Sequence, residues 1–177
     1  SKIPETELDT ILETIQKNEK YTLELERVEK EEQQRQDKLG SKQLDKDHSK
    51  NVKSDEYKIQ QIYRKTVKAL KERIKTIELN PKYVPNSKQH IKLWSKDKDT
   101  DTSFTSDIDD ETVTKIMYLN VDKAYKILLL MGIGVFVKDI NKEYLDVMKG
   151  LAIQQKLFVI IASSDYIYGT NYQFCHG

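Results

Sequence analysis

An apolar run from Leu157 to Ala162 limits the possible folds of this chain more than any other segment. Its six consecutive residues, four of them β-branched or aromatic, have the length and composition of a buried strand. Two small hydroxyl residues, Ser163 and Ser164, follow it directly. Ligands of α/β folds bind at the carboxyl ends of strands, so we expect these serines to face a functional crevice.

The residues before this run predict a second strand and a connecting helix. Residues 133–137 read as a strand after Gly132, and residues 141–154 read as a helix with one apolar face. A strand, a helix and a strand in this order predict parallel strands with a right-handed crossover, hence an α/β sheet covered by helices. Two strands are too few for an independent sheet. The apolar face of the helix consists of Tyr144, Leu145, Met148, Leu151 and Ala152.

Capping residues place two further helices before the first strand. Asp109 and Asp110 suit the first turn of a helix that ends at Leu119. Asp122 can cap another helix, which continues to about Met131. The compact part of the chain therefore begins near Asp109.

The first eighty residues are polar and predict two long helices, at 5–38 and 55–79, joined by a loop at 40–54. Each helix carries one apolar stripe with steps of three and four residues, although Asn18 and Thr22 interrupt the first. We therefore expect an antiparallel, coiled-coil-like hairpin in which each helix covers the stripe of the other. The stripes consist of Leu8, Ile11, Ile15, Leu25 and Val28, and of Ile59, Tyr63, Val67, Leu70, Ile74 and Ile77.

Proline and charge define the remaining boundaries. Asn80-Pro81 stops the second helix, and a short helix runs from about Pro85 to Trp94. We predict three segments: the hairpin with this short helix at 1–95, a flexible acidic linker at 96–108, and a partial α/β lobe at 109–177.

The net charge of +1 hides an uneven distribution. Residues 50–98 hold fourteen Lys/Arg and five Asp/Glu, whereas residues 99–122 hold one Lys and seven acids. This asymmetry favours a basic arm that binds phosphates through Arg64, Lys68 and Lys71. An exposed lysine-rich helix without a ligand is the alternative, and spacing does not separate the two.

The single cysteine, Cys175, excludes an internal disulfide and fits a reducing, intracellular compartment. The longest apolar run, Ile127–Val137, is too short to cross a bilayer, so no membrane partner is expected. The three histidines (His48, His90, His176) are too far apart to predict a metal site. The start without Met and the end at Gly177 suggest a fragment of a longer polypeptide.

Three short motifs follow one another along the chain: Gly132-Ile-Gly-Val135, Ala162-Ser163 and Gly169-Thr-Asn171. Over residues 109–177 the chain resembles the second RecA-like lobe of superfamily 2 helicases, in the Ski-type branch and that of large DNA viruses. The resemblance departs at Phe136-Val137, where the Ski-type pattern has two histidines.

This resemblance implies a fragment of an ATP-dependent helicase or translocase that acts on RNA or DNA. It places Ser163 and Ser164 against the nucleic-acid strand, and Gly169 and Asn171 at the nucleotide cleft between the lobes. It implies ATP and Mg²⁺ as cofactors of the intact protein, the first RecA-like lobe as a partner, and a viral factory or virion as a location. The motifs for phosphoryl transfer are absent, so no catalytic residue is expected within this chain and the fragment alone should be inactive.

Two other functions fit the residues. A non-enzymatic coiled-coil module with a small α/β cap would bind another protein and ignore nucleic acid. A nucleotidyl or glycosyl transferase lobe would need a pair of acidic metal ligands, whereas Asp165 stands alone after the last strand.

Overall fold

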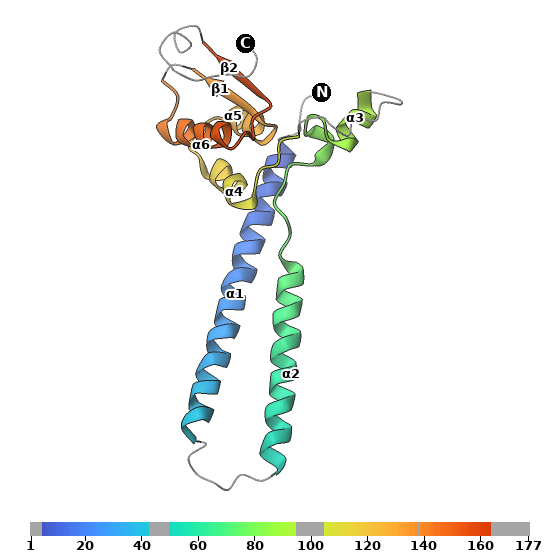
Figure 1. Ribbon diagram of the computed structural model, residues 1–177, viewed down its shortest axis with the longest axis vertical. Coiled ribbons are helices and arrows are strands. Elements are labelled where there is room, and N and C mark those ends of the chain that lie inside the picture. The colour runs from blue at the N-terminus through green and yellow to red at the C-terminus, as the bar shows by residue number, and fades with distance from the viewer. Residues whose placement is uncertain (1–4, 43–49, 95–104, 138, 164–177) are drawn as a thin grey trace. The chain divides into compact units, whose positions relative to one another are not determined.

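The computed structural model describes residues 5–42, 50–94, 105–137 and 139–163 (Figure 1). The chain forms two units. One unit is Glu13–Thr76, and the other combines Ser1–Leu12 with Ile77–Gly177.

The first unit is a helical hairpin made by α1 (Thr6–Lys42), from Glu13 onward, and by α2 (Lys50–Arg73), as Figure 1 shows. The guanidinium carbon of Arg73 lies 5.9 Å from the centre of the Tyr21 ring. Nearer the other end of the hairpin, the pKa of Arg35 is raised chiefly by its hydrogen bond to Glu32, and to a smaller extent by the charge of Glu56. Early residues of α1 therefore meet late residues of α2, which confirms the antiparallel arrangement.

The seam of this hairpin is apolar only in part. Ile15 and Leu70 are buried, whereas Glu32 occupies a buried position that an apolar residue would fill in a regular coiled coil. Ile59 and Ile74 were predicted to lie in the seam but are 43% and 37% exposed, so this part of the predicted stripe is wrong. The half-buried members of the seam are Leu25, Val28, Tyr63 and Val67.

Helix α2 ends at Arg73, six residues before the predicted end at Leu79. The side chain of Asn18 binds the backbone of Lys75 as donor and as acceptor, which stabilises a non-helical path beyond Arg73. At their other ends both helices extend into the predicted loop at 40–54, to Lys42 and from Lys50. Residues 43–49 lie outside the described residues.

The second unit contains a parallel strand–helix–strand arrangement, as predicted. Strand β1 (Ile133–Phe136) pairs with β2 (Val159–Ala162) in a register that joins Ile133 to Val159 and Phe136 to Ala162. Helix α6 (Lys142–Ile153) connects them and buries Tyr144, Met148 and Leu151. These are three of the five residues on the predicted apolar face; Leu145 and Ala152 are half-buried.

Side-chain caps begin the helices around this sheet. A carboxylate oxygen of Asp109 accepts from the Thr112 N–H at 2.8 Å and begins α4 (Asp110–Tyr118). Asp122 accepts from the Ala124 N–H at 2.8 Å and begins α5 (Lys123–Leu130). Asn141 caps α6 in the same manner. Both predicted aspartate caps are confirmed.

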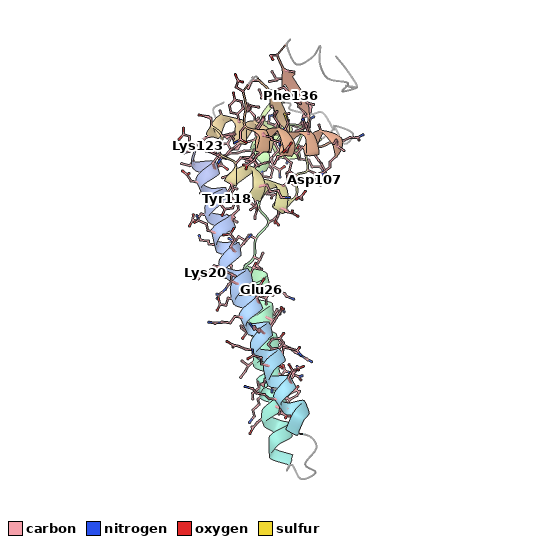
Figure 2. The ribbon with its side chains drawn as sticks, turned by 90° about the vertical axis from the view of Figure 1, so that its left-hand side faces the viewer. Lys20, Glu26, Asp107, Tyr118, Lys123 and Phe136 are labelled. Atoms are coloured by element: carbon pink, nitrogen blue, oxygen red, sulfur yellow. The ribbon has the colours of Figure 1, made fainter. Side chains whose placement is uncertain are left out.

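The core of this unit includes the first turns of α1, where Leu8 and Ile11 are buried. These first turns of α1 therefore belong to the sheet unit. The same unit includes η1 (Pro81–Tyr83) and α3 (Lys88–Trp94). This division replaces the predicted boundary between 95 and 96. Among the described residues, the other buried apolar side chains of the unit are Ile77, Leu79, Val113, Ile116, Met117, Leu119, Leu129, Leu130, Val135 and Phe136, the last labelled in Figure 2.

The last residues of the predicted flexible linker, 105–108, contact the residues just before β2. Ser106 Oγ donates to the carbonyl oxygen of Lys156 at 2.7 Å, and the ammonium of Lys156 lies 3.7 Å from the Asp107 carboxylate. Residues 105–108 therefore belong to the sheet unit, while residues 95–104 lie outside the described residues.

Candidate nucleic-acid interface

Ser163 stands directly after β2, at the carboxyl end of the parallel pair. Its N–H donates to the carbonyl oxygen of Phe136 at 3.1 Å, which extends the pairing of the strands by one residue. Its hydroxyl oxygen has almost no exposed surface, contrary to the expectation that this serine faces a crevice, and has no hydrogen-bond partner among the described residues. Buried hydroxyls without a partner are uncommon, because their desolvation costs about 1–3 kcal/mol.

The other residues predicted at this end of the strand are Ser164, Gly169 and Asn171. All three lie outside the described residues, as do Asp165 and Cys175. The described part of the predicted strand-end site is therefore Ser163.

The glycines that carry the resemblance have packing roles in this structure. Gly132 has a φ of +80°, and a Cβ added there would lie 2.7 Å from the Cβ of Ser106. A Cβ added at Gly134 would lie 2.9 Å from Met148 Sδ and 3.0 Å from Leu157 Cδ1. The first glycine permits a left-handed turn into β1, and the second permits α6 to approach the sheet closely.

Tyr144 covers the edge of β1. Its hydroxyl oxygen accepts from the N–H of Val135 at 3.0 Å, and its ring meets the ring of Tyr125 edge to face with centroids 5.7 Å apart. Burial raises the pKa of Tyr144, although the hydrogen bond from Val135 opposes this rise. Sequence reasoning placed Tyr144 on the apolar face of its helix but missed the backbone group that it satisfies.

The three cations predicted on α2 lie on one flank of that helix. Arg64, Lys68 and Lys71 follow one another by four and three residues, and all are exposed. The ammonium of Lys68 lies 3.8 Å from the carboxylate of Glu72, but both side chains are well exposed and such a pair contributes only about 0–1 kcal/mol. We call Arg64, Lys68 and Lys71 the basic stripe.

Within the hairpin, α2 has a net positive charge and α1 has a net negative charge. Residues 55–76 carry seven Lys/Arg and three Asp/Glu, a net charge of +4. Residues 13–39 carry six Lys/Arg and eight Asp/Glu, a net charge of −2, with both signs represented on the exposed surface by Lys20 and Glu26 (Figure 2). A polyanion would therefore bind to α2 in preference to α1.

A shallow hollow of 340 Å³ lies between α4 and α6. One of its walls carries the ion pair between Lys115 and Glu111, whose charged atoms are 2.7 Å apart. Its lining does not include Ser163, so this hollow is not the crevice expected at the end of β2. The lining residues are Thr114, Lys115, Tyr118, Leu119, Glu143 and Val147.

Within the described ranges no three His, Cys, Asp or Glu side chains gather in a manner that would hold a metal ion. His90, the one histidine inside these ranges, is half-buried on α3. No helix in the same ranges has the length and apolar character needed to cross a membrane. Comparison with protein-family models, with curated proteins and with solved structures yields no match.

Proposed function

We propose that this chain forms part of the second RecA-like lobe of a superfamily 2 helicase, with the hairpin as an arm that binds nucleic acid. The position of Ser163 at the carboxyl end of the parallel pair, with a hydroxyl that has no described hydrogen-bond partner, is the observation that carries the proposal, and contact with a phosphate requires movement of the residues that cover this hydroxyl. Parallel strands bind ligands at this end, and a serine hydroxyl can donate to a phosphate oxygen. The motif matches at Gly132–Val135 and Ala162–Ser163 support the same assignment.

In this proposal the lysine that binds the ATP phosphates and the acidic ligands of Mg²⁺ come from outside this chain. Gly169 and Asn171 contribute to one wall of the nucleotide cleft, and Ser163 and Ser164 contact the strand. The chain alone is expected to show no ATP hydrolysis, because it lacks the phosphate-binding lysine and the acidic metal ligands.

The test uses a polypeptide in which this chain is joined to a nucleotide-binding lobe. Ser163→Ala should slow duplex unwinding about tenfold, since a hydrogen bond to a charged group contributes about 1.5 kcal/mol or more. The variant should fold normally, because no described side-chain hydrogen bond of Ser163 is lost. Ser163→Thr keeps the hydroxyl and should retain most of the activity. Unwinding at the original rate by Ser163→Ala would disprove this site.

A second candidate, a protein-interaction module, is favoured by apolar residues on the surface of the hairpin. Leu23 and Ile62 are 67% and 64% exposed. Under this alternative the chain would bind a protein or a second copy, and added oligonucleotide would have no effect. Electrophoretic mobility shifts at low and high salt separate the candidates, because contacts with phosphates weaken as salt rises.

A further inference from the structure

An exposed aromatic residue continues the basic stripe toward the start of α2. Tyr57 precedes Arg64 by seven residues, which is close to two helical turns, so both side chains leave the same flank. Tyr57 is 64% exposed, and Gln61 lies between it and Arg64. From Tyr57 to Lys71 this flank extends for about 21 Å along the helix.

Tyr57 does not belong to the apolar surface of α2. Ile62 follows it by five residues, which places the two side chains about 140° apart around the helix axis. Ile59 is still further away, about 160° around the helix. The ring of Tyr57 is therefore grouped with the cations and not with the exposed isoleucines.

Cations and an aromatic ring on one flank match the chemistry of single-stranded nucleic acid. Lysine and arginine bind phosphates without reading sequence, and aromatic rings stack on the faces of unpaired bases. In a duplex these faces are covered by neighbouring bases, so an exposed ring gains little from it. Arg73 is oriented differently: it lies over the ring of Tyr21, between the two helices.

We infer that the flank formed by Tyr57, Gln61 and the basic stripe binds single-stranded RNA or DNA, with the Tyr57 ring stacked on a base. This inference rests on the proposed role of the hairpin as a nucleic-acid-binding arm and specifies its substrate. It is independent of the contact proposed for Ser163.

Fluorescence anisotropy of labelled oligonucleotides with the full chain tests the inference. The probes are a single strand, a strand of equal length with abasic positions, and a blunt duplex. Tyr57→Ala should weaken single-strand binding about 5- to 150-fold and leave abasic-strand binding unchanged. Tyr57→Phe keeps the ring and should retain the affinity. Arg64→Ala should weaken binding to both single strands and reduce the slope of log K against log salt by about 0.7.

Leu23→Ala is the matched control, because Leu23 is 67% exposed on the other helix of the same hairpin. It should leave all affinities unchanged. Equal binding of the single strand by Tyr57→Ala and by the original chain would overturn the inference, as would equal affinity for single strand and duplex. If variants of the basic stripe still weaken binding in that case, the hairpin binds nucleic acid through its cations but without the stacking contact of Tyr57.

One set of results would overturn both this inference and the proposal that the hairpin binds nucleic acid. None of the variants at Arg64, Lys68 and Lys71 would then alter oligonucleotide binding. Sedimentation would instead show self-association of the chain that Ile62→Asp abolishes. The unwinding measured with Ser163→Ala would still report separately on the helicase lobe.

Discussion

The side-chain amide of Asn18 donates to the carbonyl oxygen of Lys75 at 2.6 Å and accepts from the N–H of Lys75 at 3.0 Å. One side chain of α1 thus satisfies both backbone groups of a residue that lies just beyond the end of α2. Asn18 is 8% exposed, so water has little access to replace it. This pair of hydrogen bonds stabilises the departure of the chain from helical geometry after Arg73.

Replacement of Asn18 by leucine should destabilise the chain. In an ordinary helical seam leucine would improve packing, but here it leaves the N–H and C=O of Lys75 without their partner. The expected loss is about 1–3 kcal/mol in the free energy of unfolding. Urea denaturation followed by circular dichroism measures it, with Lys20→Ala on the exposed face of α1 as the control. A more stable Asn18→Leu variant would show that the seam there is a regular helix–helix contact.

The three described glycines of the sheet unit should respond differently to alanine. Gly132→Ala should be the most damaging, because it combines a φ of +80° with a Cβ only 2.7 Å from Ser106. Gly134→Ala should cost about 1–3 kcal/mol through overpacking against Met148. Gly150→Ala should stabilise by about 0.5–1 kcal/mol, because a Cβ there meets nothing within 4 Å and alanine favours helix.

A double variant distinguishes overpacking from a change in strand propensity. Met148→Ala removes the sulfur that the new methyl group of Gly134→Ala would approach. The alanine at 134 should therefore cost less in the Met148→Ala background than in the original chain. Equal costs in the two backgrounds would show that Met148 is not the obstacle.

The sequence was sufficient for the elements whose signals are local. Asp109 and Asp122 bind backbone groups two or three residues away, so capping chemistry predicts their helices from neighbouring residues. The end of α2 could not be predicted in this way, because the group that accommodates it, Asn18, is 57 residues away from Lys75. The apolar spacing through Ile77 continued past the true end and suggested a longer helix.

At the candidate site, too, the sequence predicted what depends on neighbouring residues but not what depends on distant ones. The spacing of Arg64, Lys68 and Lys71 places them on one flank of any helix, and in α2 all three side chains are exposed. The backbone of Ser163 is bound by the carbonyl oxygen of Phe136 in β1, 27 residues earlier in the chain, and its hydroxyl has no partner among the described residues. Nothing in the residues next to Ser163 indicates whether its hydroxyl has a partner.

Loss of the Tyr144 hydroxyl should destabilise the sheet unit. Tyr144→Phe keeps the ring and its contact with Tyr125 but leaves the N–H of Val135 without its acceptor. The expected cost is about 1–3 kcal/mol, because both groups are buried. Urea denaturation measures it, and faster hydrogen exchange at the Val135 amide should accompany it. Tyr125→Phe is the control, since it retains the ring pair and the Tyr144 hydroxyl. Unchanged stability of Tyr144→Phe would mean that this hydrogen bond contributes nothing net.

The cap at Asp109 should make part of the stability depend on acid pH. The hydrogen bond from the Thr112 N–H lowers the pKa of Asp109 below its ordinary value of 3.8, because it favours the ionised carboxylate. The unfolded chain therefore takes up this proton at a higher pH than the folded chain does. The contribution of the ionised cap is complete above pH 3.8 and is lost as the pH falls through the lower value of the folded state.

Asp109→Asn keeps an acceptor for the Thr112 N–H but does not titrate. From neutral pH to about 2.5, this variant should lose less stability than the original chain, and Asp109→Ala should be about 0.5–2 kcal/mol less stable than the original at neutral pH. Thermal unfolding at low ionic strength measures both effects, and Asp146→Asn, at an exposed position of α6, controls for the general loss of negative charge. A constant difference between Asp109→Asn and the original chain across this range would show that the cap gains nothing from ionisation.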